Sequence, residues 1–275
     1  MKKKNHEKHL AGVIPLTDSE SHHGRLWHDV LTPIAKDVSA IQNAVYQCAW
    51  AGCDTIWISS NYEDIGLTRK IIGDWVYDPV DWDRTNGNKR VRKEIPIYYV
   101  PIVPHDRNIG RNSLSWSSLH GAFMAFKVGW SISSWVTPDV FFVAFPMGVC
   151  DYKTIRANRL NFRKGKNKIF KHGDDSILTD CLLPFTLDKD VFVQTRRHIR
   201  AGGKLDLPTA FQCYNDLGFD FLDMLWYDDI RDWDHYREYL GSDRSKEIEP
   251  QDWNKIRFSR HKLWRLNGQQ NEEQD

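Results

Sequence analysis

Two pairs of adjacent carboxylates are the residues in this sequence best suited to hold a cation. They are Asp174-Asp175 and Asp228-Asp229. Hard divalent ions take oxygen ligands, and one or two carboxylates suffice when phosphate groups supply the rest. Such a pair can therefore hold the metal on a nucleotide diphosphate. An aspartate just before a helix is also a common N-cap, so for Asp229 both interpretations stay open.

A polar loop follows the first apolar run of the chain. Residues 11–16, AGVIPL, lead directly into TDSESHHGR at residues 17–25. This pattern is typical of a strand that runs into a loop, and ligands often bind at such loops. The adjacent His22 and His23 have no spaced cysteine or carboxylate partner, which favours an exposed loop over a metal site.

A basic stretch at residues 153–171 contains eight cations and no acidic residue. They are Lys153, Arg156, Arg159, Arg163, Lys164, Lys166, Lys168 and Lys171. Tyr152, Phe162 and Phe170 are interleaved with them, and rings beside cations can stack on bases next to phosphate contacts. The stretch is therefore a candidate nucleic-acid surface or, alternatively, a solvated charged lobe.

Local patterns predict the elements that would position these residues. Ala11–Leu16 is expected to be a strand, and Ser39 is expected to cap a helix over Ala40–Ala51 that ends at Gly52. A buried strand is predicted at Thr55–Ser59. Together they form a β-loop-α-β unit, from which parallel sheets with right-handed crossovers are built.

The alternation of strands and helices continues along the chain. The predicted elements are a helix at Ile65–Trp75, a strand at Pro96–Pro104, a helix at Ser118–Trp130 and a strand at Val140–Phe145. The last of these is apolar throughout, as strands buried on both faces are. We therefore predict an α/β fold with a Rossmann-like, mixed, mostly parallel sheet and helices on both of its faces.

Bulk properties point to a folded cytoplasmic protein. The 275 residues carry a net charge of +1, with 41% hydrophobic and 27% charged residues, so net charge alone indicates no polyanionic partner. Five cysteines without a C-x-x-C pair fit a reducing compartment. No export signal is evident, and no apolar run approaches the ~20 residues of a membrane span. The oligomeric state is not predicted.

Four motifs in order resemble those of the sugar-1-phosphate nucleotidyltransferases. Their residues are Ala11–Leu16 with Gly24–Trp27 and Leu31–Ala35, then Ala40–Ser60 with its Ala51-Gly52-Cys53-Asp54 hinge, then Tyr98–Val100 with Ser117–Ala122, and finally Trp226–Tyr236. The last is similar to a Trp-x-Asp-(Ile/Val)-Gly-Thr element of that family. The motifs span residues 11–240, which are expected to form the domain, with a basic insertion or lobe at about 152–175. Residues 241–275 are expected to be a C-terminal extension with a frayed end.

The resemblance implies an enzyme that joins an NTP to a sugar phosphate and releases pyrophosphate. It assigns phosphate contact and catalysis to Arg25, and Mg²⁺ or another divalent cation to Asp151 and Asp229. The residues expected to bind the nucleotide are Leu16, Thr17, Asp18, Gly24, Ser118, His120 and Gly121. The expected partners are thus a nucleotide with a sugar phosphate, or a sugar nucleotide.

Several positions depart from the family pattern. The loop at residues 17–25 holds one glycine, Gly24, where the family has several, and no Gly-Asp pair follows Val140–Phe145, so Asp151 is the nearest substitute. Arg231 and Asp232 stand where Gly-Thr is usual. Two alternatives therefore remain: a metal-dependent glycosyltransferase that uses a sugar nucleotide, and a catalytically silent relative that acts as a binding module.

Overall fold

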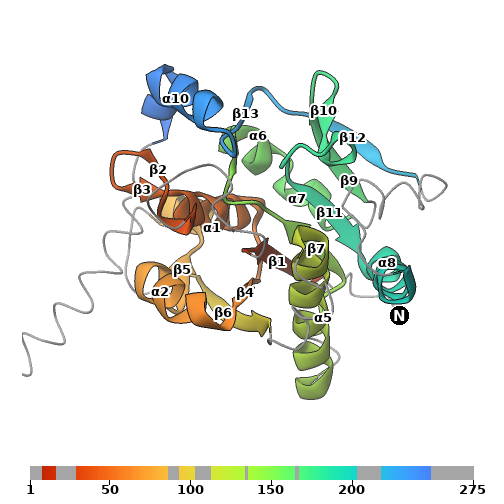
Figure 1. The fold of residues 1–275 in the computed structure, drawn as a ribbon. Helices are drawn as coiled ribbons and strands as arrows, with labels where there is room; N and C mark the ends of the chain where they lie inside the picture. Colours follow the sequence, from red (N-terminus) through yellow and green to blue (C-terminus); the bar gives the residue numbers. More distant parts are fainter. Residues whose placement is uncertain are drawn as a thin grey trace, which may run out of the picture.

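The computed structural model describes residues 8–16, 29–85, 93–102, 113–133, 136–164, 167–202 and 218–248 (Figure 1). Among these residues, no helix combines the length and apolar character that a bilayer crossing requires.

A mixed sheet lies at the centre of the described part of the chain. Its strand order is β10-β9-β11-β7-β1-β4-β6-β5, and β12 pairs with β9. The central strands β7, β1, β4 and β6 are parallel to one another, whereas β11 pairs antiparallel with β7 and β5 pairs antiparallel with β6. The bounds are β1 Leu10–Pro15, β4 Thr55–Asn61, β5 Trp75–Tyr77, β6 Glu94–Ile102, β7 Val140–Val143, β9 Lys168–His172, β10 Asp175–Ser176, β11 Phe185–Asp188 and β12 Asp220–Asp223. The predicted fold class is confirmed.

Helices cover both faces of this sheet. α5 and α8 pack against each other on one face, where α5 covers β1, β4 and β6, while α1, α2, α6 and α7 lie on the other (Figure 1). Their bounds are α1 Ala40–Ala51, α2 Tyr62–Ile72, α5 Leu114–Ile132, α6 Tyr152–Ala157, α7 Arg159–Phe162 and α8 Lys189–Gly202. The short α3 (Pro79–Arg84) packs beside α1.

Smaller elements form a rim around the sheet. They are η1 Asp29–Leu31, β2 Pro33–Ala35, β3 Val38–Ser39, β8 Gly148–Cys150, η2 Ile177–Thr179, β13 Tyr227–Asp229, α10 Trp233–Gly241 and α11 Arg244–Glu247. α10 is attached to β2, because the hydroxyls of Tyr236 and Tyr239 donate to the carbonyl oxygens of Pro33 and Ile34 at 2.7 and 2.9 Å.

Two predicted helices have different bounds in the structure. α2 ends at Ile72 rather than Trp75, because Gly73 adopts a φ of 79° and Trp75 pairs with Pro96 in the sheet. α5 begins a turn before Ser118, since the Ser113 hydroxyl caps it by accepting a hydrogen bond from the Trp116 amide at 3.2 Å. Both differences come from contacts that a periodicity pattern does not contain.

α1 begins and ends where its caps predict. The Ser39 amide donates to Oε1 of Gln42 at 2.8 Å, which is half of a capping box. At the other end Gly52 takes a left-handed conformation with φ 82°, and its amide reaches the carbonyl oxygen of Ala49 at 3.1 Å. A Cβ at Gly52 would lie 2.6 Å from Nε of Arg159, so both the backbone angle and the space favour glycine.

We therefore expect Gly52→Ala to lower the free energy of unfolding by at least ~1–2 kcal/mol, the cost of a left-handed residue with a Cβ, plus the cost of displacing Arg159. Gly66→Ala is the matched control, because Gly66 lies inside α2 and its added Cβ would meet nothing within 4 Å. Urea denaturation should show Gly66→Ala at or above wild-type stability. Equal effects of the two substitutions would contradict this explanation.

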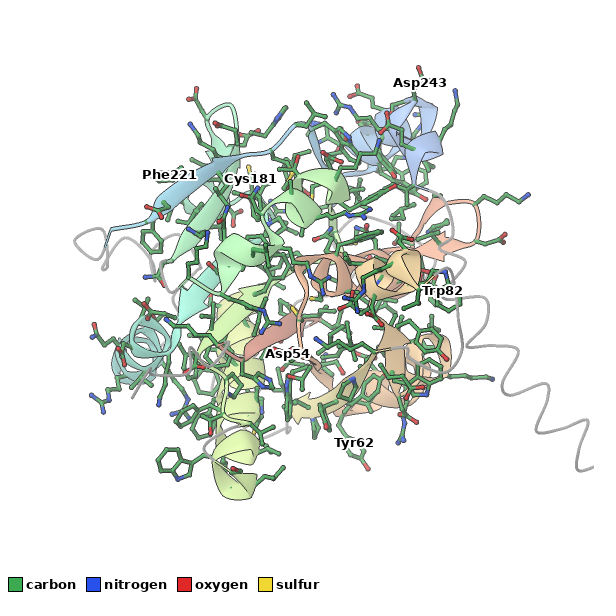
Figure 2. All side chains as sticks on the ribbon, turned by 180° about the vertical axis from the view of Figure 1, so that it is seen from behind. Asp54, Tyr62, Trp82, Cys181, Phe221 and Asp243 are labelled. Carbon is green, nitrogen blue, oxygen red and sulfur yellow. The ribbon has the colours of Figure 1, made fainter. Side chains whose placement is uncertain are left out.

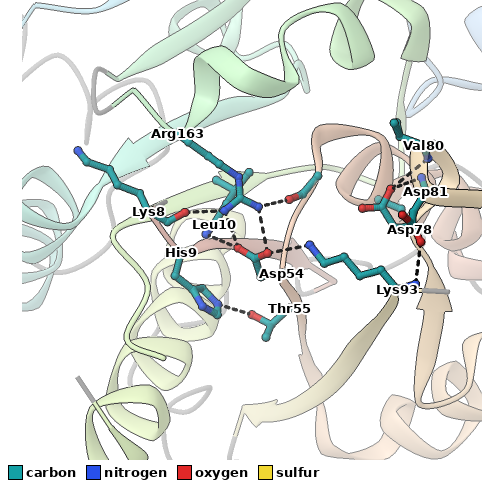
Figure 3. A network of polar contacts seen from close by, with 12 residues as sticks. Lys8, His9, Leu10, Asp54, Thr55, Asp78, Val80, Asp81, Lys93 and Arg163 are labelled. Atoms are coloured by element: carbon teal, nitrogen blue, oxygen red, sulfur yellow. Dashed lines mark hydrogen bonds and ion pairs between the residues drawn. The ribbon is translucent and has the colours of Figure 1, made fainter. Parts of the chain in front are cut away.

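A partly buried ion-pair network joins three segments at the amino ends of β1 and β4 (Figure 3). The carboxylate of Asp54 pairs with Arg163 at 2.8 Å and with Lys93 at 2.9 Å, and it accepts a hydrogen bond from the Leu10 amide at 3.0 Å. Arg163 also donates to the carbonyl oxygen of Gly52 at 2.7 Å. Asp54 therefore fixes α7, the end of α1 and the start of β1 relative to one another.

This network makes stability depend on pH in the acid range. Burial alone raises the pKa of Asp54, but Arg163 and Lys93 lower it by more, to about 2. The folded pKa lies below the unfolded value of about 3.9, so the stabilisation is present above pH ~4 and is lost as the pH falls towards 2. The difference corresponds to about 2 kcal/mol.

Asp54→Asn should therefore destabilise the protein at pH 7, and the gap to wild type should narrow by about 2 kcal/mol between pH 4 and pH 2. Chemical denaturation at each pH measures it. Asp74→Asn serves as the control, because the Asp74–Arg69 pair is exposed and contributes little at any pH. A pH-independent gap for Asp54→Asn would rule out the carboxylate as its cause.

Candidate functional site

The carboxyl end of β1 lies at the switch point of the sheet. β1 pairs in parallel with β4 on one side and with β7 on the other, and the chain proceeds outward from β1 in both directions. Open α/β sheets bind ligands outside the carboxyl ends of their strands at such a point. Leu16 lies there, buried, with its amide donating to the Ser59 carbonyl oxygen at 2.8 Å.

The predicted loop residues Thr17, Asp18, Gly24 and Arg25 lie outside the described residues. Their nucleotide and phosphate contacts remain predictions.

The predicted nucleotide-binding residues on α5 lie in its second turn and pack against the sheet. The Ser118 hydroxyl donates to the Leu114 carbonyl oxygen at 2.7 Å, and the His120 ring stacks on Trp116. A Cβ on Gly121 would lie 2.9 Å from Cγ1 of Val13, so this glycine lets α5 approach β1 closely. The structure shows these contacts within α5 and with β1. Contact of Ser118, His120 and Gly121 with a nucleotide remains a prediction.

A short antiparallel ladder between β8 and β13 forms the other wall of the site. Asp229 is opposite Gly148 in this ladder, and Tyr227 is opposite Cys150. The Tyr227 hydroxyl accepts a hydrogen bond from the Leu182 amide at 2.7 Å, and burial raises the pKa of this tyrosine. A Cβ on Gly148 would lie 2.0 Å from the Leu182 carbonyl oxygen, so the segment around Leu182 is held tightly against the ladder.

A cleft of about 1000 Å³ opens beside this ladder, between η2, β13 and α10. Figure 2 labels Cys181, which lines it, and Asp243, which lies between the lining residues Ser242 and Arg244. Leu114 at the start of α5 also lines the cleft and brings it to the carboxyl edge of the sheet. The charged lining residues are Asp175, Asp180, Asp228, Asp229, Asp232, Glu238, Arg231 and Arg244.

Asp151, the first predicted metal ligand, is an N-cap in the structure. Its buried carboxylate accepts hydrogen bonds from the Lys153 amide at 3.0 Å, the Thr154 amide at 3.2 Å and the Thr154 hydroxyl at 2.7 Å. These bonds satisfy donors at the start of α6. Asp229 pairs with Gly148 in the ladder, whereas Asp151 follows Cys150, the last residue of β8. The two carboxylates are therefore not opposite each other.

Asp229, the second predicted ligand, is chelated by Arg231. Nε and Nη2 of Arg231 lie 3.0 and 2.7 Å from Oδ2 of Asp229, and Nε also lies 3.1 Å from Oδ1. The neighbouring Asp228 is bound to Nη1 of Arg244 at 2.9 and 3.0 Å. Asp232 caps α10, as its amide partners Asp234 and His235 show.

The carboxylates as they stand do not fit a divalent cation. In the described segments, no three His, Cys, Asp or Glu side chains gather in a way that could hold a metal ion. An ion bound to Asp229 would also lie beside the Arg231 guanidinium, and at ~4 Å a divalent charge meets about twice the ~4 kcal/mol repulsion of two unit charges near a protein surface. The metal role of Asp151 and Asp229 remains a prediction, and no step of chemistry is assigned to a metal here.

Arg231, Arg244 and Asp180 are among the cleft residues that the sequence did not mark as functional. Asp180 has a φ of 64°, which is unusual for a residue with a side chain, and its carbonyl oxygen accepts a hydrogen bond from Nη2 of Arg231 at 2.6 Å. The one available signal was the replacement of the usual Gly-Thr by Arg231 and Asp232. This replacement marked residue 231 as unusual, but it did not predict that Arg231 would bind Asp229 and Asp180.

The cations of the basic stretch are mostly paired with carboxylates. The pairs are Lys153–Glu247, Arg156–Asp83, Arg159–Asp78, Arg163–Asp54, Lys168–Asp220 and Lys171–Asp223. Phe162 and Phe170 are buried, and their rings contact each other, while Tyr152 stacks on Trp50. These contacts give the stretch a structural use, and nucleic-acid binding through it remains a prediction.

Comparison with known proteins places the fold in one group of enzymes. No protein-family profile and no curated protein sequence matches the chain. Solved structures, in contrast, match the fold of this chain. A putative glucose-1-phosphate thymidylyltransferase from Bacillus anthracis superposes with a TM-score of 0.65 at 13% identity, covering 89% of this chain and 98% of that one.

Two further structures agree with the first. A UDP-glucose pyrophosphorylase complexed with UDP-glucose gives a TM-score of 0.57 at 12% identity, over 85% of this chain and 97% of that one. A 4-diphosphocytidyl-2C-methyl-D-erythritol synthase from Anaerococcus prevotii gives a TM-score of 0.53 at 11% identity, over 86% of this chain and 96% of that one. The chain therefore has the nucleotide-diphospho-sugar transferase fold that nucleotidyltransferases share, as its motifs predicted.

The two roles of Asp151 can be separated by substitution. Asn is about as good an N-cap as Asp, whereas Ala is not, so Asp151→Ala should lower the free energy of unfolding by ~1 kcal/mol and Asp151→Asn by less. Denaturant melts of both variants measure this. If both variants keep wild-type stability but lose a Mg²⁺-dependent shift of the melting temperature, Asp151 is a ligand and not mainly a cap.

Proposed function

We propose that this protein is a nucleotidyltransferase-like enzyme that joins an NTP to a sugar phosphate and releases pyrophosphate. The observation that carries the proposal is the charged cleft between η2, β13 and α10, which Leu114 at the start of α5 also lines, in a fold shared with enzymes of this type. The likeness in fold supports this class of reaction, and the base and the sugar are left open.

The reaction asks little covalent chemistry of the protein. A phosphate oxygen of the sugar phosphate attacks the α-phosphorus of the NTP, and the bond to the β,γ-diphosphate breaks, so that pyrophosphate leaves with the electron pair. Positioning and neutralisation of phosphate charge supply most of the rate. In the proposed site, Arg25, from the segment that follows β1 in the sequence, contacts the phosphates, and Arg231 and Arg244 supply cations in the cleft.

A binding module without turnover is the second candidate. Two observations favour it: both oxygens of Asp229 are bound by Arg231, and Asp151 is committed to the start of α6. These are the carboxylates to which the family resemblance assigns the metal. A relative that has lost the metal would keep the cleft and bind its ligand without joining the two substrates.

The two candidates give different results with purified protein. A thermal-shift screen with NTPs, sugar phosphates and sugar nucleotides should find at least one stabilising ligand, since a ligand at 100 times its Kd adds ~2.7 kcal/mol to the free energy of unfolding. Pyrophosphate formation from an NTP and a sugar phosphate would establish the enzyme. Binding without product would establish the module, and release of an NDP from a sugar nucleotide would indicate a glycosyltransferase. A chain that none of these ligands stabilises would contradict the proposal.

Arg25→Ala should weaken nucleotide binding at least tenfold while leaving the fold intact. A charge-assisted bond to phosphate contributes ~1.5–3 kcal/mol, whereas a loop arginine contributes little to stability. Calorimetric titration measures the affinity, and circular dichroism verifies the fold. An unchanged affinity in a folded variant would remove Arg25 from the site.

A further inference from the structure

We propose that the Arg231 guanidinium takes the place of a divalent cation at this cleft, so that phosphate binding there does not depend on metal. The inference deepens the proposed function: it rests on that function for the ligand, but not for the cation.

Arg231 is bound by Asp229 and Asp180, which lie on two different segments, as a metal ion between two carboxylates would be. Asp229 on β13 binds its Nε and Nη2, while Asp180 after η2 binds its Nη2 through the carbonyl oxygen and its Nη1 through the carboxylate at 3.4 Å. The two aspartates are 49 residues apart in the chain, and Arg231 joins the segments that carry them. This is the bridging contact that a cation would otherwise make.

The backbone also supports this arrangement. The Arg231 amide donates to Oδ1 of Asp229 at 3.0 Å, so the same carboxylate orients the start of the arginine as well as its end. Asp180 is held at a left-handed φ of 64°, which places its carbonyl oxygen against Nη2. A residue with a side chain keeps such a conformation only where its surroundings fix it.

The charge of Arg231 is secure. Burial on its own lowers the pKa of Arg231, but its hydrogen bonds to Asp229 and the charges of Asp229 and Asp180 raise it by more, so the net pKa is higher than usual. The side chain is 31% exposed and lines the cleft, so it can contact a ligand there while its aspartates hold it. Nε and Nη2 are hydrogen-bonded to Asp229 and Asp180, and the guanidinium fixed in this way carries a positive charge that attracts phosphate oxygens.

The carboxylates that line the cleft predict how the protein should respond when Arg231 is removed. Removing the guanidinium would leave Asp229, Asp180, Asp175 and Asp228 around one cleft with less cationic charge among them. No three of these carboxylates gather among the described residues, but a hard divalent ion can take one or two carboxylates, such as Asp229 and Asp180, and complete its coordination with water. Arg231→Ala should therefore gain a metal affinity that the wild-type protein lacks.

The experiment titrates Mn²⁺ alone into the chelator-treated, full-length protein and follows the melting temperature and the electron paramagnetic resonance signal of free Mn²⁺. We expect no shift for wild type, a rise in melting temperature with loss of free signal for Arg231→Ala, and loss of that gain in the double variant Arg231→Ala/Asp229→Asn. Arg237→Ala is the matched control, because Arg237 is an exposed arginine on α10 outside the cleft lining. It should behave as wild type.

Arg231→Gln provides a second variant that keeps hydrogen-bonding groups without the charge, should Arg231→Ala fail to fold, and it should also gain Mn²⁺ binding. Wild-type Mn²⁺ binding that Asp229→Asn abolishes would overturn the inference, as would a folded Arg231→Ala or Arg231→Gln that binds no Mn²⁺. These readouts need no substrate, so they can fail or succeed independently of the proposed function.

The ligand side of the inference is tested with inorganic pyrophosphate as the probe. Its affinity for wild type should be the same in Mg²⁺ and in EDTA, and Arg231→Ala should lower it at least tenfold in EDTA. A wild-type affinity that falls tenfold or more in EDTA would overturn the inference. If pyrophosphate does not bind under either condition while the Mn²⁺ results hold, the proposed ligand class fails and the cation assignment stands.

Discussion

Close packing of β1 between two helix layers is the constraint on which the rest of this structure depends. All six residues of β1 are buried, and β4 and β7 flank it in parallel. A Cβ on Gly12 would lie 2.9 Å from Sγ of Cys48, and one on Gly121 would lie 2.9 Å from Val13. Because both positions lack side chains, α1 and α5 can approach the strand from opposite faces. The carboxyl end of β1 is thereby fixed in place.

The two edges of the sheet use charged residues in opposite ways. At the amino edge, Asp54, Arg163 and Lys93 form a network that ties segments together, and Arg163 and Asp54 are only 17% and 24% exposed. At the carboxyl edge, charged residues line an open cleft instead. Paired charges near the surface stabilise modestly, but pairs around a cavity also determine which ligand charge can enter.

The pairing of Arg231 with Asp229 explains how the chain can keep this fold while departing from the family motif. The resemblance places Gly-Thr at residues 231 and 232, and here Asp232 still caps α10 while Arg231 turns back onto the preceding carboxylate. The helix start is therefore retained and the carboxylate acquires an internal cation.

Local patterns in the sequence were enough for the central elements. The apolar run at residues 11–16, Ser39 and Gly52 predicted β1 and α1 closely, because hydrophobic periodicity and helix caps act over a few residues. The order of the motifs also predicted the fold class. Only the tertiary structure decided how the charged residues are used, since Arg163 and Asp54 are 109 residues apart, Arg159 and Asp78 are 81 apart, and Arg231 reaches Asp180 across 51. An ion pair depends on side chains meeting in space, and residue type with spacing along the chain does not specify that meeting.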